Sequence, residues 1–505
     1  MWTVIAFAVI IYVILWLIVL KYRKPYENIP GVSQLMPDFG KMIPYINPYT
    51  LKKIVGHGCH NSAYQLMRKL KTNVMRVTTW TQTQIFISDA EVLKEIFLKN
   101  PENFPKPQQS YKPLLLYGDN IVNSNFDVWR KHRNICQPAF HENHMRFLAE
   151  QTVISTNTLL NFWGKRGDAF DIDVETDLTN ITLDVIGKVN FGYNLNVFGE
   201  DTFDASKHKM SFKNALITTV NLGLLVKGIL PEWTHFAFPT VVTAYEETKS
   251  YIKDLIDSRL NSSEQKYDLL SLLIEGNIRN GELSNEDVLA DSFIFLFAGH
   301  ETSATTLMWC LYELAIKQRV QQKLFDEVDS ILKNKDPVYE DYEKLLYLNS
   351  VVNETLRLHS AVAMIPKENL KPFKIGKHYV PAKTTLLVNV FAVHNDEKYW
   401  PNPSEFRPER FLDGTKIAPC TYLPFSFGLR KCKNATCRRQ LILLGIGNKF
   451  SLVETCMILA MIVQKYEIHI SKQETRVFSD EKPIDNYVVV TVKPKDLKIE
   501  LRRRK

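Results

Sequence analysis

The sequence lacks several patterns that would assign a function class directly. No segment is repeated and none is of low complexity, which excludes repeat architectures and fibrous proteins. The 63 basic and 55 acidic side chains leave a net charge of only +8 over 505 residues, too dilute a surplus to indicate a nucleic-acid partner. Gly445-Ile446-Gly447 lacks the third glycine of a dinucleotide fingerprint and a preceding strand. We therefore expect no nucleotide site of this type.

Cysteine is scarce and lacks paired spacing. The seven cysteines are scattered and odd in number, which predicts a reducing compartment rather than a disulfide framework. Around Cys432, the neighbours Arg430, Lys431 and Lys433 concentrate positive charge near the thiol. Such a field favours the thiolate, which is the form that binds metal. A zinc site made of Cys420, Cys432 and Cys437 is the alternative, although it lacks CxxC spacing.

One long hydrophobic run predicts a membrane anchor. Residues 2–20 contain no charge and only Thr3 as a polar side chain. A helix of this length reaches about 28 Å, the thickness of the hydrocarbon core of a bilayer. Three basic residues follow within 21–24 and predict that the remaining chain lies in the cytoplasm. A cleaved signal peptide is disfavoured because no basic residue precedes the run and no small-residue cleavage site follows it. A buried helix of a soluble protein is the second alternative.

The remaining sequence predicts a mainly α fold with a minor β component. Residues 72–88 are rich in Thr, Val and Ile and predict strands. The longest helical pattern begins at Ser284, a good N-cap with Asp287 three residues later, and continues for about 30 residues. We expect an anchor with its basic stop over 1–24 and one large domain over 25–505, rather than three domains.

The centre of that long helix is unusual. Ala298 and Gly299 carry little or no side chain, and Glu301 and Thr302 follow in an otherwise apolar helix. A glycine and a buried carboxylate are both unfavourable there unless they serve a purpose. Space, an acid and a hydroxyl at one place indicate a cavity in which something is protonated. The alternative is a kinked helix with a solvated polar turn.

Two further patterns carry charges. Glu354 and Arg357 are three residues apart on one helical face, a spacing that alone is common on protein surfaces. The segment 400–411 is dense in proline and aromatic residues and predicts an ordered loop. This loop could deliver Arg407, Glu409 or Arg410 to a buried partner.

Taken in order, these elements resemble the cytochrome P450 family of haem-thiolate monooxygenases. The motifs that carry the resemblance are WRKHR (Trp129–Arg133), AGHETS (298–303), ETLR (354–357), FRPERF (406–411) and FSFGLRKC (425–432). They match the WxxxR helix, the acid–Thr helix, the ExxR pair, the PERF element and the first eight positions of the haem signature FxxGxRxCxG. The N-terminal anchor is typical of microsomal members.

The resemblance implies a role for each matching residue. Cys432 is implied as the axial thiolate of the iron of haem b, and Trp129, Arg133 and Arg430 as partners of the haem propionates. Glu301 and Thr302 are implied to steer protons during oxygen activation, with Ala298 and Gly299 leaving room for oxygen and substrate. Glu354, Arg357 and Arg410 are implied to form a structural network behind the haem.

The sequence departs from the family pattern at two places. Ten residues after Arg357, where relatives carry a propionate-binding arginine, this chain has Lys367, which keeps the charge but loses the bidentate fork. After Cys432 the family requires any residue and then glycine, whereas Lys433 and Asn434 stand here. The missing continuation reappears at 446–450, so residues 433–445 are inserted at the ligand itself.

A retained intron is our leading hypothesis for the insert. If Cys432 is TGT and Lys433 is AAG, GTAAG begins within the cysteine codon, and a TTA codon at Leu444 supplies an acceptor AG with Gly445. Removing these 39 nucleotides restores FSFGLRKCIGNKF, a complete signature. The alternative is a genuine surface loop, which costs little entropy but must preserve the geometry of the cysteine.

The resemblance implies a monooxygenase anchored in the endoplasmic reticulum membrane by a single span, acting on a lipophilic substrate with O₂. Electrons would come from NADPH–cytochrome P450 reductase, with cytochrome b5 as a further candidate donor. One alternative is a relative that rearranges or dehydrates peroxides without a reductase; another is a catalytically dead haem or lipid binder. The stretches 111–120 and 216–233 are predicted to contact the substrate, but do not identify it.

Overall fold

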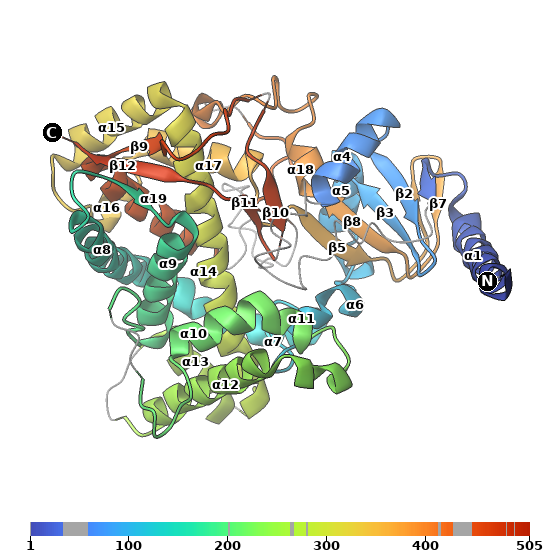
Figure 1. Cartoon of the computed structure of the whole chain (residues 1–505), viewed down its shortest axis with the longest axis horizontal. Helices are drawn as coiled ribbons and strands as arrows, with labels where there is room; N and C mark the ends of the chain where they lie inside the picture. The colour runs from blue at the N-terminus through green and yellow to red at the C-terminus, as the bar shows by residue number, and fades with distance from the viewer. Residues whose placement is uncertain are drawn as a thin grey trace.

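The computed structural model describes most of the chain. The described residues are 2–33, 59–199, 203–262, 267–278, 281–412, 416–427, 447–480, 482–488 and 490–504. Within them the fold is mainly helical with small sheets, as predicted from the sequence. Figure 1 shows the sheet-rich part of the molecule at one end of its long axis and most of the helices at the other.

The helices make up the larger part of the structure. The longer ones are α1 (Trp2–Arg23), α4 (Cys59–Lys69), α7 (Phe126–Cys136), α8 (Glu142–Gly164), α9 (Val174–Phe191), α12 (Pro239–Leu260), α13 (Leu269–Ile278), α14 (Asn285–Ile316), α15 (Gln318–Leu332), α17 (Leu346–Leu358) and α19 (Asn448–Lys465). The shorter ones are α5 (Ala90–Lys94), α6 (Gln108–Tyr111), α10 (Phe212–Thr218), α11 (Leu224–Val226), α16 (Tyr339–Tyr342) and α18 (Val390–His394).

The strands within the described residues form four small sheets. A five-stranded sheet has the order β1 (Gly31–Ser33), β2 (Val74–Thr78), β3 (Thr83–Ile87), β8 (Thr385–Asn389) and β5 (Met364–Glu368). A three-stranded sheet has the order β4 (Ala169–Ile172), β12 (Ile499–Arg503) and β9 (Tyr466–Ile470). Two hairpins pair β6 (Phe373–Ile375) with β7 (His378–Val380) and β10 (Asn486–Val488) with β11 (Val492–Pro494). The strands predicted over 72–88 are thus confirmed as β2 and β3.

Helix α14 runs through the middle of the molecule (Figure 1). Ser284 accepts a hydrogen bond from the backbone N–H of Asp287, whose side chain accepts one from the backbone N–H of Ser284, so the predicted N-terminus is confirmed as a capping box. Most of its residues are buried, and it packs against α9 along much of its length. Two large apolar cores share this helix, one with α17 and α19 and one with α9, α12 and α13.

Helix α1 covers the apolar run predicted to be an anchor, and it projects from the sheet end of the molecule (Figure 1). Its backbone carbonyl at Tyr22 accepts a hydrogen bond from Thr83 on β3. Ile10, Leu17 and Leu20 are exposed. Of the helices that the structure describes, none combines the length and hydropathy required to cross a bilayer.

Candidate active site

One face of α14 is open although the rest of its central part is buried. Phe295, Ala298, Gly299 and Thr302 are half-buried, whereas the other residues from 296 to 301 are buried. Their spacing of three and four residues places them on the same side of the helix. The sequence pattern predicted a cavity at this point, and the partial exposure of this stripe leaves room for a further group to cover it.

Gly299 has a packing reason to be glycine. A Cβ atom built on this residue would lie 2.6 Å from Cδ1 of Ile186 on α9. A methyl group at this position would force the side chain of Ile186 to move within the closely packed interface of α9 and α14. The missing side chain therefore allows the two helices to approach, in addition to the space that was predicted for oxygen and substrate.

Thr302 ends the open stripe. Its hydroxyl donates a hydrogen bond of 2.9 Å to the backbone carbonyl of Ala298, one turn earlier. The hydroxyl proton is used in this bond, so the hydroxyl oxygen can still accept a hydrogen bond from a group on the open side of the helix. Thr306 makes the equivalent bond to the carbonyl of Thr302 but is itself buried, so the two threonines differ mainly in access.

Glu301 is held by residues from the β10–β11 hairpin. One carboxylate oxygen, Oε1, lies 2.8 Å from Nζ of Lys493 and accepts a 3.0 Å hydrogen bond from Thr491. All three side chains are buried. Burial alone would raise the pKa of Glu301, but Lys493, His300 and the two hydrogen bonds hold it below its ordinary value. The pair is therefore ionised.

A second acid shares the same lysine. Nζ of Lys493 lies 3.5 Å from Oε1 of Glu175 on α9. Burial lowers the pKa of Lys493, yet the charges of Glu301 and Glu175 outweigh this effect and raise it. Sequence reasoning did not find Lys493 or Thr491. The available signal was a lysine within the strand-forming run YVVVTVK, where a charge is costly without a partner.

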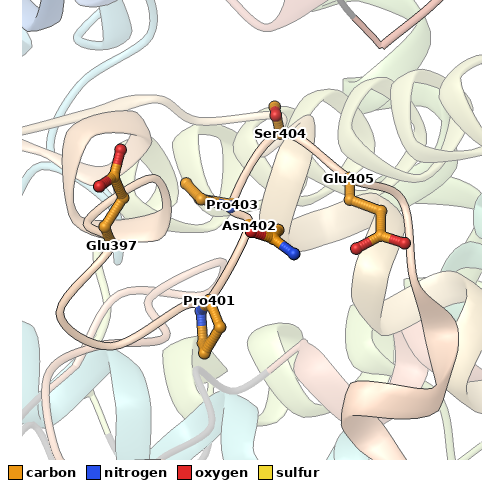
Figure 2. Close-up of a pocket in the computed structure, with 6 residues that line it drawn as sticks. All are labelled: Glu397, Pro401, Asn402, Pro403, Ser404 and Glu405. Carbon is orange, nitrogen blue, oxygen red and sulfur yellow. The ribbon is translucent and has the colours of Figure 1, made fainter.

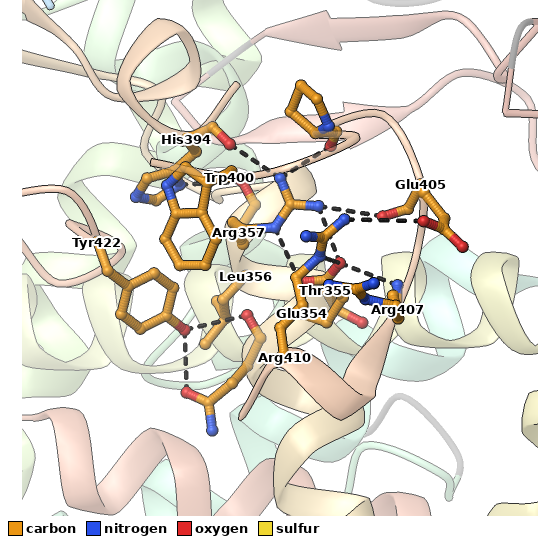
Figure 3. Close-up of polar contacts among 12 residues, drawn as sticks. Glu354, Thr355, Leu356, Arg357, His394, Trp400, Glu405, Arg407, Arg410 and Tyr422 are labelled. Carbon is orange, nitrogen blue, oxygen red and sulfur yellow. Dashed lines mark hydrogen bonds and ion pairs between the residues drawn. The ribbon is translucent and has the colours of Figure 1, made fainter. Parts of the chain in front are cut away.

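The predicted network of Glu354, Arg357 and Arg410 is present as a cluster of contacts (Figure 3). Nε and one terminal nitrogen of Arg357 each donate a 2.8 Å bond to a different carboxylate oxygen of Glu354, a bidentate geometry. Nε of Arg410 lies 3.2 Å from Oε1 of Glu354, and the backbone N–H of Arg407 donates to the same oxygen. Glu354 and Arg357 are 0% exposed, so their partners are needed to offset desolvation.

The same arginine also holds the loop that follows. Arg357 donates to the backbone carbonyls of His394, Pro403 and Glu405. Burial lowers the pKa of His394 to about 3, so its imidazole is neutral. Its Nδ1 donates to the carbonyl of Arg357 and its Nε2 accepts from the backbone N–H of Leu423. This histidine thus ties α17 to the chain segment that leads toward Cys432.

A surface recess of about 750 Å³ lies on the outer side of this loop (Figure 2). It is lined by Glu397, Pro401, Asn402, Pro403, Ser404 and Glu405. In the figure the two carboxylates stand on opposite sides of the proline segment. None of the predicted site residues lines the recess, and its own lining offers no nucleophile activated by a base.

The predicted propionate partners lie on two other elements. Trp129 and Arg133 are half-buried one turn apart on α7, with the guanidinium 5.6 Å from the centre of the indole ring. Lys367 is half-buried on β5, and its Nζ lies 5.5 Å from the ring centre of Phe97. Arg430 and Cys432 lie outside the described residues, as does the insert 433–445.

The family model described as "Cytochrome P450" matches residues 37–501. The chain belongs to the cytochrome P450 family. "Cytochrome P450 monooxygenase 124" of Postia placenta is 32% identical over 446 residues, covering 83% of each protein. "Cytochrome P450 3A13" of Mus musculus is 28% identical over 407 residues, covering 78% of each. The chain is thus a cytochrome P450 monooxygenase, as predicted, and its family binds haem.

The fold agrees with this assignment. The solved structure titled "Crystal structure of cytochrome P450DA heme domain" superposes with a TM-score of 0.78 and covers 94% of this P450 and 98% of the solved chain. Their sequences are 24% identical, so this match concerns the fold.

A buried acid that sequence reasoning passed over lies at the interface of α14 and α19. Glu454 is 0% exposed, and neither carboxylate oxygen has a hydrogen-bond partner among the described residues. Burial raises the pKa of Glu454 to about 8 and outweighs the opposite effect of Ser303. The feature of the sequence that could have indicated this buried acid is a glutamate inside the apolar run SLVETCMILAMIV. At neutral pH this carboxyl is mostly protonated.

Proposed function

We propose that this P450 inserts one oxygen atom of O₂ into a lipophilic substrate. Two electrons arrive from NADPH through NADPH–cytochrome P450 reductase, with cytochrome b5 as a further candidate donor. The second oxygen atom leaves as water, so each turnover consumes two protons. The observation that carries the proposal is the open stripe of α14, which ends at the accessible hydroxyl of Thr302 with the ionised Glu301 beside it.

The residues present fit a haem. Trp129, Arg133 and Lys367 are half-buried, as are Ala298, Gly299 and Thr302, and a large planar group would cover such surfaces. The cations suit the propionates, together with Arg430, and the thiolate of Cys432 would bind the iron. When bound, haem supplies the activation of O₂ at its iron.

The chain's own residues orient the substrate and handle protons. Ala298 and Gly299 leave the open face of α14 free of bulk, while Thr302 offers its oxygen as a hydrogen-bond acceptor on that face. Successive residues of a helix point about 100° apart, so Glu301 and Thr302 lie on adjacent faces. Because Glu301 is ionised, it can relay a proton to the Thr302 face only by first accepting one, and its carboxyl group must then turn toward that face or be bridged to it by a water. Glu354, Arg357 and Arg410 hold the loop behind the site.

We infer attachment to the endoplasmic reticulum membrane through residues 1–24, with the domain 25–505 in the cytoplasm. The apolar run and the basic residues after it support this placement. A second observation supports contact with a lipid surface, because Trp233, which ends the predicted substrate stretch 216–233, and Phe236, three residues later, are 75% and 83% exposed.

We further propose that residues 433–445 derive from a retained intron, because 446–450 continue the interrupted haem signature. Sequencing complementary DNA across this region tests the proposal. A transcript population lacking the 39 nucleotides is expected. Transcripts that uniformly contain them would contradict it and establish the segment as a loop of the protein.

The absorption spectrum of the reduced, carbon monoxide-bound chain tests the haem site. The thiolate-ligated Soret band is expected from the chain without 433–445, and Cys432→Ser should abolish it. Cys437→Ser, made in the full chain, is the matched control and should leave the spectrum of that chain unchanged. A thiolate band that survives Cys432→Ser would overturn the ligand assignment. If only the full chain fails to give this band, the written sequence is a dead haem or lipid binder.

Replacing Thr302 tests proton handling. In the reconstituted system with reductase, Thr302→Ala should divert most NADPH oxidation away from product, a drop of about tenfold in product per NADPH if proton delivery loses one positioned group. Thr306→Ala removes a similar hydroxyl one turn away from a buried position and should retain coupling. Equal coupling in both variants would contradict the role of Thr302.

The insert at the predicted ligand favours one second candidate, a P450 that rearranges or dehydrates a peroxide without a reductase. This candidate predicts turnover of a lipid hydroperoxide with no NADPH consumption. NADPH-dependent oxygenation that requires the reductase supports the monooxygenase instead. Glu301 and Thr302 favour the monooxygenase, since a peroxide substrate brings its own activated oxygen.

A further inference from the structure

His132 and Asp291 form a completely buried pair between α7 and α14. Nδ1 of His132 lies 2.6 Å from Oδ2 of Asp291, and both side chains are 0% exposed. His132 stands between Trp129 and Arg133 on α7, within the motif WRKHR. The helix packs otherwise on α13, where Ile135 lies against Gly276. The buried pair joins α7 to the central helix, where the longer and more exposed ion pair of Lys131 with Asp287, at 3.8 Å, also links the two.

The other oxygen of the same carboxylate holds a different segment. Oδ1 of Asp291 accepts a 2.8 Å hydrogen bond from the backbone N–H of Ile121. Ile121 belongs to residues 114–124, which we call the α7-leading segment. Asn120 braces this segment by donating to the carbonyl of Leu114 and accepting from the backbone N–H of Val122. One carboxylate thus binds both the segment and the helix that follows it.

The α7-leading segment overlaps 111–120, one of the two stretches predicted to contact the substrate. Tyr117 stacks on Tyr245 of α12 with ring centres 4.6 Å apart, and it meets Phe293 of α14 edge-on at 4.8 Å. Its hydroxyl donates to the carbonyl of Tyr245. A ligand that moves Tyr117 would therefore displace the chain four residues before the amide that Asp291 holds.

Such a pair is a costly way to pack two helices. Burial raises the pKa of Asp291 despite the opposing effect of His132. Nε2 of His132 has no hydrogen-bond partner among the described residues, the nearest acid being Asp287 at 3.8 Å. Apolar side chains would pack these helices at lower cost, whereas buried polar pairs specify one geometry. The arrangement thus indicates positioning rather than stability.

We propose that His132 and Asp291 are positioning residues that fix, through one carboxylate, both the α7-leading segment and the rotation of α7. The inference rests on the proposed function where it treats Trp129 and Arg133 as haem partners. It follows that occupation of the substrate region and the hold on the haem propionates are coupled at Asp291.

The first test needs no haem. Hydrogen exchange of residues 114–124, measured by mass spectrometry on the full chain, should become about tenfold faster in His132→Leu, because Asp291 then loses the partner that orients the carboxylate holding Ile121. In Asp291→Asn the amide oxygen can still accept the hydrogen bond from Ile121, and the amide nitrogen can donate to Nδ1 of His132 in its other tautomer. Hydrogen exchange of 114–124 in this variant should therefore stay within about twofold of the unmodified chain. Unchanged exchange in His132→Leu would overturn the coupling.

Two variants guard against general loss of folding. Ser292→Ala removes a neighbouring hydroxyl on α14 that is 0% exposed and has no partner among the described residues, so it should leave exchange unchanged. His132→Asn restores a nitrogen donor near Asp291 and should recover part of the protection. Equal acceleration in Ser292→Ala would show a non-specific effect and contradict the proposal.

The second test addresses haem. Transfer of haem to excess apomyoglobin should be about tenfold faster from His132→Leu, in whichever form of the chain, with or without 433–445, takes up haem. Faster exchange of 114–124 without faster haem transfer would contradict the propionate role of α7 and limit the pair to the α7-leading segment. No change in either measurement would overturn the inference while leaving the monooxygenase proposal intact.

Discussion

Glu354 and Glu454 are both 0% exposed glutamates on helices of the same core, yet their surroundings are opposite. The carboxylate of Glu354 accepts bonds from two guanidinium groups and a backbone amide (Figure 3). The carboxyl of Glu454 has no hydrogen-bond partner among the described residues. Equal burial therefore goes with very different numbers of charged donors around the two carboxyl groups. The first residue stabilises a rigid support, and the second is a neutral acid poised to ionise.

The largest expected effect comes from removing Arg357, the main partner of Glu354. Arg357→Met leaves the buried carboxylate of Glu354 with the weaker contact to Arg410. Three backbone carbonyls also lose their guanidinium donor. We expect the free energy of unfolding to fall by about 5 kcal/mol, measured by urea unfolding followed by circular dichroism. Arg407→Met is the matched control, because Arg407 is exposed and contributes its backbone N–H to Glu354. A loss in Arg357→Met no greater than in this control would contradict the analysis.

The next effect concerns pH and Glu454. Its pKa is raised from 4.5 to about 8 in the fold, so its contribution to stability is fully present below pH 4.5 and is lost as the pH rises through 8. The unmodified chain should lose up to about 5 kcal/mol over this range relative to Glu454→Gln, which cannot ionise. Urea unfolding at several pH values measures the difference. Glu150→Gln, an exposed position on α8, should follow the unmodified chain.

Lys493→Met should have a somewhat smaller effect and should make Glu301 resemble Glu454. Losing the ammonium leaves a buried carboxylate with Thr491 and costs about 3 kcal/mol near neutral pH. The pH dependence should also change sign. With Lys493 present, the lowered pKa of Glu301 gives stability above pH 4.5 that is lost as the pH falls. Without it, burial raises this pKa and stability falls as the pH rises.

The same unfolding series tests this reversal. Lys498→Met, at an exposed lysine beyond the hairpin, is the control and should keep the original slope. A slope in Lys493→Met identical to that of the control would show that Lys493 does not set the charge of Glu301.

Local patterns predicted those features whose partners are close in the sequence or belong to a recognised motif. The capping box of Ser284 and Asp287 spans three residues, and β2 and β3 follow from one run of strand-forming residues. The ExxR and PERF elements predicted the contacts of Glu354. In contrast, Thr491 lies 190 residues from Glu301, and Asp291 lies 159 residues from His132. No periodicity in a single sequence reports which distant side chains will meet.

Strand β12 has a consequence for the order in which the molecule can be assembled during synthesis. It is the central strand of its sheet, between β4 and β9, and the nearby hairpin supplies the only ammonium that Glu301 contacts among the described residues. Helix α14 leaves the ribosome long before either element exists. The nascent chain must therefore carry Glu301 without its lysine partner, and the three-stranded sheet near α8 and α9 lacks its central strand. At about 5–20 residues per second, this vulnerable interval lasts on the order of ten seconds or more. Chaperones that shield exposed apolar helices would act in that interval.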